Sequence, residues 1–96
     1  MRIKVQRLSI GTTAAKLVPS EPGRAMQVLI RNAGSADIYI GPTSAVTTAN
    51  GHPIGPSESF GLSIETADAY GGQILPEIWA IAGSAQPASV LEVYVD

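Results

Sequence analysis

The residues that could do acid–base or nucleophilic chemistry are few in this chain, and they do not form a recognisable constellation. Its one histidine, His52, directly precedes a proline in a turn-like stretch, which favours a solvent-exposed turn residue over a general base. Ser57 and Ser59 flank Glu58, but Gly-Pro-Ser-Glu-Ser is not the Gly-x-Ser-x-Gly elbow of serine hydrolases. We therefore expect no catalytic residues and interpret the chain as a protein that is not an enzyme.

Metal ligation has equally little support in the sequence. The chain has no cysteine and no aspartate-rich loop of the EF-hand type, so no dedicated zinc or calcium site is predicted. Glu65 and Asp68 could share a calcium ion in one loop, but solvated loop carboxylates are much commoner. We expect neither a metal ion nor another cofactor.

Aromatic side chains are better candidates for binding, because small β-proteins often display them. Trp79 stands in an apolar stretch, which favours core packing over display. Tyr39 and Tyr94 are expected on outer faces of strands, and Tyr70 in a loop. Exposed tyrosines occur at subunit interfaces as well as at sugar sites, so a protein partner and a glycan both stay open.

The cations gather near the start of the chain, where Arg2, Lys4 and Arg7 form a small basic edge. These residues are either solvated positions of an edge strand or contacts to an acidic partner. The net charge of −2 removes the electrostatic basis for strong nucleic-acid binding. The residues expected to bind a partner are Arg2, Lys4, Arg7, Arg24, Tyr39 and Tyr94.

The composition indicates one soluble domain with a partly covered surface. Of its 96 residues only 15% are charged, against about 25% in average soluble domains. So low a charge indicates that part of the surface is covered by a partner or by copies of the same chain. No run could span a bilayer, and the stretch after the N-terminus is too polar for a signal peptide. We expect neither a membrane partner nor export by an ordinary signal.

The pattern of short apolar runs between glycines and prolines predicts an all-β fold. We expect a single small antiparallel β-sandwich or jelly roll of about eight short strands. Residues 1–96 form one domain in this interpretation, with 1–10 as an N-terminal arm or an edge strand. The expected strands are 2–10, 12–18, 26–32, 37–40, 46–48, 57–65, 74–82 and 90–95.

A β-hairpin is predicted at the centre of the fold. Val28 and Ile30 must share a face with the isoleucines of 38–40, because side chains alternate along a strand. Pairing Ile30 with Ile38 leaves a three-residue loop, 33–35, of a length common in hairpins.

The first and last strands have patterns of their own. The apolar positions of 2–10 change parity near Gln6-Arg7, which predicts a β-bulge or a change of partner strand. In the last strand, the branched residues from Leu91 onward are expected inside, with Glu92 and Tyr94 outside.

Four stretches together resemble a known group of proteins. They are Val28-Leu-Ile-Arg-Asn32, Ile38-Tyr-Ile-Gly41, Val46-Thr-Thr-Ala-Asn-Gly-His-Pro53 and Glu58-Ser-Phe-Gly-Leu62. This succession is similar to small β-sandwich proteins encoded among bacteriophage virion genes, and it runs from Val28 to Leu62. One element departs from the group's Gly-Glu-Ser, since Gly55-Pro-Ser-Glu-Ser59 has its glycine displaced by two positions.

The resemblance implies a capsid decoration (cement) protein, made in the host cytoplasm without a signal peptide and located on the virion surface. Its partner would be the major capsid protein, and a homotrimer is the favoured oligomer. We expect residues 1–7 to contact the capsid or exchange strands, with Arg24 and the loop 43–56 as second choice. The alternative is a carbohydrate-binding or host-surface adhesion module of a phage head fibre or tail.

Overall fold

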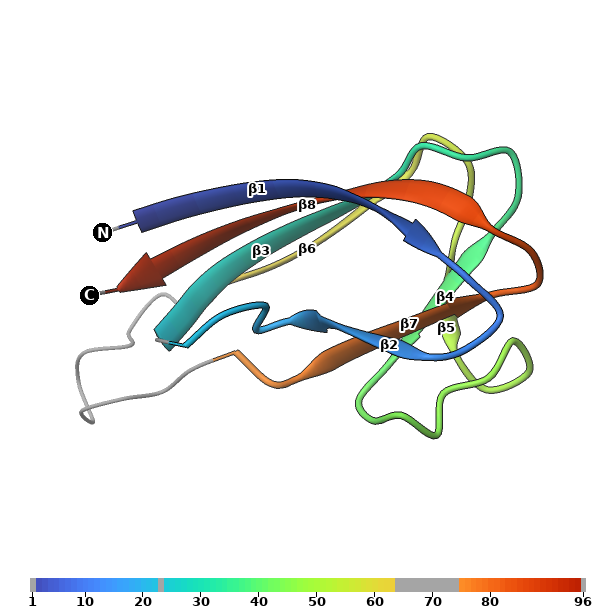
Figure 1. Cartoon of the computed structure of the whole chain (residues 1–96), viewed down its shortest axis with the longest axis horizontal. Coiled ribbons are helices and arrows are strands. Elements are labelled where there is room, and N and C mark those ends of the chain that lie inside the picture. Colours follow the sequence, from blue (N-terminus) through green and yellow to red (C-terminus); the bar gives the residue numbers. More distant parts are fainter. Residues whose placement is uncertain (1, 23, 64–74, 96) are drawn as a thin grey trace.

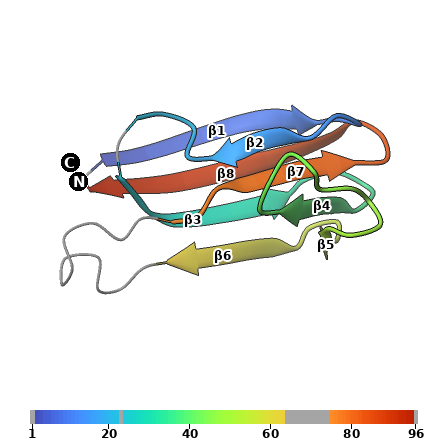
Figure 2. The same cartoon turned by 90° about the horizontal axis from the view of Figure 1, so that it is seen from below.

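The computed structural model describes residues 2–22, 24–63 and 75–95. Over these residues the chain forms eight strands and no helix, and the strands make two four-stranded sheets stacked as a β-sandwich (Figure 1; Figure 2). The strands are β1 (Arg2–Ile10), β2 (Ala15–Val18), β3 (Arg24–Asn32), β4 (Ile38–Gly41), β5 (His52–Ile54), β6 (Ser59–Ser63), β7 (Ile78–Ala82) and β8 (Gln86–Val95).

The strand order is that of a jelly roll. One sheet has the order β1-β8-β3-β6 and the other β2-β7-β4-β5, with every pairing antiparallel. The first strand pairs with the last, the second with the seventh, the third with the sixth and the fourth with the fifth. Such an order results when one long antiparallel ribbon is rolled into two packed sheets. The predicted fold class is confirmed.

The core lies between the sheets and is almost entirely aliphatic. Val28 and Ile30 of β3 are buried, as are Ile38 and Ile40 of β4, so all four lie in the core, although they come from two sheets and not from one face of a hairpin as predicted. Each such side chain contributes about 1.5–3 kcal/mol relative to its exposed state. The other buried hydrophobic residues of this cluster are Ile10, Leu17, Val18, Ala25, Ile54, Leu75, Ile78, Ala80, Ala82, Ala88, Val90 and Tyr94.

The predicted hairpin between β3 and β4 is wrong. β3 lies between β8 and β6, whereas β4 lies in the other sheet between β7 and β5. Ile30 therefore pairs with Phe60 and Val90, and Ile38 pairs with Ile54 and Ala82. Alternation fixes the face that a side chain occupies but not the neighbouring strand, so two strands facing each other across a sandwich have the same pattern as a hairpin.

Asn32 turns the chain from one sheet to the other. Its side chain is fully buried, and its Nδ2 donates to the carbonyl oxygens of Ala36 and Ile54, both at 2.8 Å. Its Oδ1 accepts from the Gly34 amide at 2.8 Å. The amide thus satisfies three backbone groups that would otherwise lack partners where the two sheets diverge.

The segment between β4 and β5 differs from the expected one. Residues 46–48 form no strand, and Val46 is instead buried beside two glycines. A Cβ on Gly41 or Gly51 would lie only 2.7 Å or 2.9 Å from Val46 Cγ2, so the loop packs tightly because both side chains are absent. His52 is exposed as predicted, but it begins β5 rather than lying in a turn.

Strand boundaries also shift at several places. β2 begins later than predicted and β7 begins at Ile78, whereas β8 begins earlier, at Gln86. β1 pairs with β8 in one unbroken register from Arg2 opposite Tyr94 to Ile10 opposite Gln86, so the bulge expected in β1 is absent. The predicted loop 66–73 and the ends of the strands next to it lie outside the described residues.

Candidate functional site

The outer surface of the sheet β1-β8-β3-β6 is the strongest candidate for a binding site. On this surface Ile3 lies opposite Val93, and Val5 continues across the sheet through Leu91 to Leu29. The exposed fractions are 65% for Ile3, 62% for Val5 and 45% for Leu29. We name these five side chains the apolar face, and a monomer gains nothing by exposing so many on one sheet.

The apolar face exists because, at the end of the sheet where β1 begins and β8 ends, polar side chains point toward the core and apolar side chains point toward solvent. The residues that point inward are Arg2 and Lys4 of β1 with Glu92 and Tyr94 of β8, so their apolar neighbours point out. This arrangement also explains why the apolar positions of β1 change parity. The strand continues without a bulge, but its apolar residues point outward in its first half and inward in its second half. The predicted orientation of β8 is wrong, since Glu92 and Tyr94 are both fully buried.

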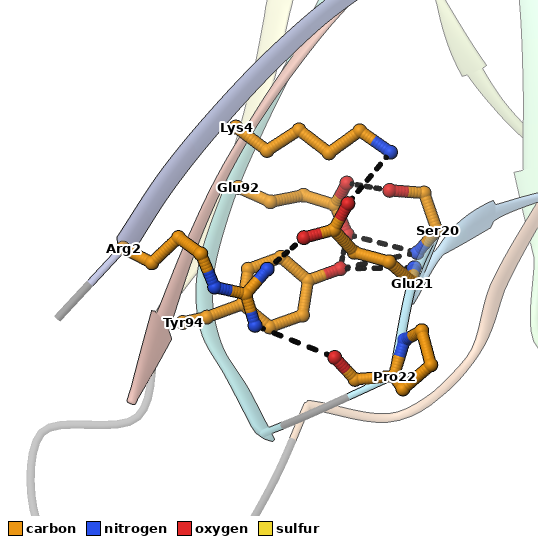
Figure 3. A network of polar contacts seen from close by, with 7 residues as sticks. All are labelled: Arg2, Lys4, Ser20, Glu21, Pro22, Glu92 and Tyr94. Carbon is orange, nitrogen blue, oxygen red and sulfur yellow. Dashed lines mark hydrogen bonds and ion pairs between the residues drawn. The ribbon is translucent and has the colours of Figure 1, made fainter. Parts of the chain in front are cut away.

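A hydrogen-bond network accounts for the burial of Glu92 (Figure 3). Its Oε2 accepts from the Tyr94 hydroxyl at 2.7 Å and from the Ser20 amide at 3.1 Å, and its Oε1 accepts from the Ser20 hydroxyl. The Tyr94 oxygen itself accepts from the amides of Ser20 and Glu21, at 3.2 and 3.3 Å. Desolvation by burial and the hydrogen bond with Glu92 raise the pKa of Tyr94 above its ordinary value.

Two cations of β1 hold the loop 19–22 beside this network through ion pairs with Glu21. Lys4 Nζ lies 3.1 Å from a Glu21 oxygen, and Arg2 forms a second ion pair with the same carboxylate. The Arg2 guanidinium also lies 4.6 Å from the centre of the Tyr94 ring (Figure 3). The structure thus brings Arg2, Lys4 and Tyr94 together. Their contacts connect β1, β8 and the loop 19–22 within the chain.

Two arginines stand at the other end of the apolar face. The register aligns Arg7 of β1 with Ser89 of β8, and Ser89 with Arg31 of β3. Because strands are about 4.8 Å apart, the two arginine Cα atoms are separated by about 10 Å. Both side chains are exposed, and neither forms an ion pair with a described residue. The arginine pair also lines a small hollow with Ala33 and Pro87.

The outer surface of the other sheet carries the aromatic candidates. Tyr39 lies opposite Ile81 and is half-buried, so its predicted outward position is confirmed. Trp79 also faces outward and is half-buried opposite Gly41, so the prediction of core packing is wrong. Its Nε1 donates to Glu77 at 3.0 Å.

Catalytic and metal chemistry gain no support from the described ranges. His52 contacts the Phe60 ring, with centroids 6.3 Å apart, and Glu58 accepts from the Gly55 amide at 2.6 Å within a turn. Within 2–22, 24–63 and 75–95, no three acidic, histidine or cysteine side chains gather as metal ligands. That part of the chain also has no helix long and apolar enough to cross a membrane.

The predicted binding residues thus fall into four places. Arg7 alone borders the apolar face, Arg24 is exposed at the start of β3, and Tyr39 lies on the opposite sheet. Tyr70, Glu65 and Asp68 lie outside the described residues. Comparisons with models of protein families, with curated proteins and with solved structures find no match to this chain.

The sequence interpretation missed Arg31 and the outward aliphatic residues. The sequence pattern that indicates them is the two-residue spacing between Val5 and Arg7 and between Leu29 and Arg31, which places each pair on one face of its strand. It becomes informative only once β8 is known to join β1 to β3.

Proposed function

We propose that this protein is a non-enzymatic structural component of a bacteriophage virion, a decoration protein that binds the major capsid protein. The observation that carries the proposal is the apolar face, which exposes three large hydrophobic side chains on one sheet of a chain with few charges. Two further points support it. One is the resemblance over Val28–Leu62, and the other is the jelly-roll strand order, an architecture that viral capsid domains share with lectins and cupins.

The mechanism in this proposal is mechanical. A protein that contacts neighbouring shell subunits adds buried area across their boundary, and it stabilises the assembled shell because it binds the assembled form preferentially. Trimeric association around a local three-fold axis is part of the proposal. The main driving force for binding to the shell is the removal of the apolar face from water.

A glycan-binding module is the second candidate. It is favoured by the outward positions of Tyr39 and Trp79 on the neighbouring strands β4 and β7. Outward aromatic rings provide apolar surfaces against which sugar rings can stack. In this case Trp79 fluorescence shifts on titration with host-surface polysaccharide, whereas capsid decoration leaves it unchanged.

The test of the proposed function uses virions of the phage whose genome carries the gene. Particles are purified from the wild type and from a strain in which the gene is deleted, and both are heated in steps while DNA release is followed. We expect the chain to co-purify with wild-type particles and to raise the temperature of DNA release. The proposal would be overturned if purified wild-type particles did not contain the chain, or if wild-type and gene-deleted particles released DNA at the same temperature.

A further inference from the structure

We propose that the apolar face and the arginine pair together form the surface that docks onto the shell. Its occupant is a coat-protein surface with an apolar centre and with carboxylates opposite Arg7 and Arg31. This inference rests on the proposed function and adds the surface used and the chemistry of the partner.

The apolar part of the surface is continuous across the sheet. Hydrogen-bonded registers align Val5, Leu91 and Leu29 in one row, which ends at Gly61 of β6. A row without a side chain at its end is flat there, and Leu29 Cδ1 is 3.5 Å from where a Gly61 Cβ would lie. Flat aliphatic rows suit a rigid partner surface because little side-chain entropy is lost on contact.

The arginine pair specifies the charge of the partner. Arg7 and Arg31 have no acidic partner among the described residues, and Glu21 and Glu92 are engaged at the opposite end of the sheet. A guanidinium pairs best with a carboxylate, in a bidentate geometry that also fixes orientation. Arginine is also one of the residue types enriched at protein interfaces.

A second copy of the chain does not fit this surface. In a two-fold dimer joined through the face, the arginines of one copy must meet outward side chains of the same sheet in the other copy. The described outward residues of that sheet are aliphatic, hydroxylic, amide or arginine side chains, and none is acidic. With respect to the described outward side chains, such a dimer therefore offers no carboxylate to the four guanidinium groups of the two arginine pairs, which costs affinity.

The experiment measures binding of purified variants to particles that lack the chain, by co-sedimentation over a range of concentrations. Val5→Glu places a charge in the apolar row, and Arg31→Glu reverses one charge of the pair. Ser44→Glu and Lys16→Glu are the matched controls, because they make the same charge changes at exposed positions away from this sheet. Thermal melts check that every variant folds, and Arg31→Glu at an exposed site keeps the test valid if Val5→Glu does not fold.

We expect both face variants to weaken particle binding about tenfold or more, while both controls bind like the wild type. Binding of the wild type should also weaken as salt rises, and less steeply for Arg31→Glu. Wild-type levels of binding by both face variants would overturn the docking surface and leave the proposed function standing. No binding by the wild type would overturn both proposals. An oligomer in solution that Val5→Glu converts to a monomer would show that a second copy covers the face.

Discussion

At the scale of single residues, the buried Glu92 decides which side of β8 faces the core. A carboxylate inside a sandwich is costly unless its oxygens are hydrogen-bonded, and here Ser20 and Tyr94 supply those bonds. Once Glu92 and Tyr94 point inward, Leu91 and Val93 must point outward. The exposed apolar surface is therefore a direct consequence of two polar side chains beneath it.

Replacing Glu92 should be among the most damaging single substitutions in the chain. Glu92→Ala removes the acceptor of the Ser20 hydroxyl and amide and of the Tyr94 hydroxyl, and it leaves a cavity. We expect the free energy of unfolding to fall by about 3 kcal/mol, measured by urea denaturation. Glu77→Ala, which removes only the exposed hydrogen bond from Trp79 Nε1, should lower it by about 1 kcal/mol or less. Equal effects of the two substitutions would contradict the structural role of Glu92.

Tyr94 should make the fold sensitive to alkaline pH. Burial and Glu92 raise the pKa of its hydroxyl above the ordinary 10.0, so the folded state holds this proton more tightly than the unfolded state. The resulting stabilisation is present below pH 10.0 and is lost as pH rises through the folded-state pKa. Between pH 8 and pH 11, the free energy of unfolding should therefore fall more steeply with pH for the wild type than for Tyr94→Phe. Parallel curves would contradict the coupling.

At the scale of elements, the connections between strands determine the jelly roll more than the strands do. The turn after β3 depends on Asn32, and the loop before β5 depends on Val46 packing beside Gly41 and Gly51. The Asn32 side chain reaches from the end of β3 to Ile54 in the other sheet, whereas Val46 packs against glycines of its own loop. Both can be tested by substitutions that differ by one functional group.

Asn32→Asp is the sharper test of the first connection. The carboxylate keeps the shape and the acceptor for Gly34, but it loses both donors and faces the carbonyl oxygens of Ala36 and Ile54. We expect a loss of about 3 kcal/mol at pH 7, part of which is regained when the carboxylate is protonated at low pH. A variant as stable as the wild type at pH 7 would show that the donors of Asn32 are dispensable.

Gly51→Ala tests the second connection. The added Cβ would lie 2.8 Å from Tyr39 Cβ and 3.0 Å from the Thr47 carbonyl oxygen, so the backbone must move. We expect a loss of about 1–3 kcal/mol in chemical denaturation. Gly83→Ala is the matched control, since nothing lies within 4 Å of its added Cβ. A harmless Gly51→Ala would mean that the loop repacks freely.

At the scale of the whole molecule, the sequence predicts the sandwich and most of its core but not the strand pairing. Alternation correctly assigned Val28 and Ile38 to the interior, because apolar side chains leave water whichever strand adjoins them. It could not distinguish a hairpin from two strands facing across the core. The site was harder still, because β8 inverts its pattern through contacts with Ser20, a residue far away in the sequence.

In the proposed complex, the sheet β1-β8-β3-β6 faces the coat protein through its outer surface. Electron cryomicroscopy of gene-deleted particles incubated with the purified chain would show which surface of the chain contacts the shell. We predict density for the chain on the shell, with the apolar face against the coat protein and acidic side chains opposite Arg7 and Arg31. Density in which the sheet carrying Tyr39 and Trp79 contacts the shell, or particles without added density, would contradict the account.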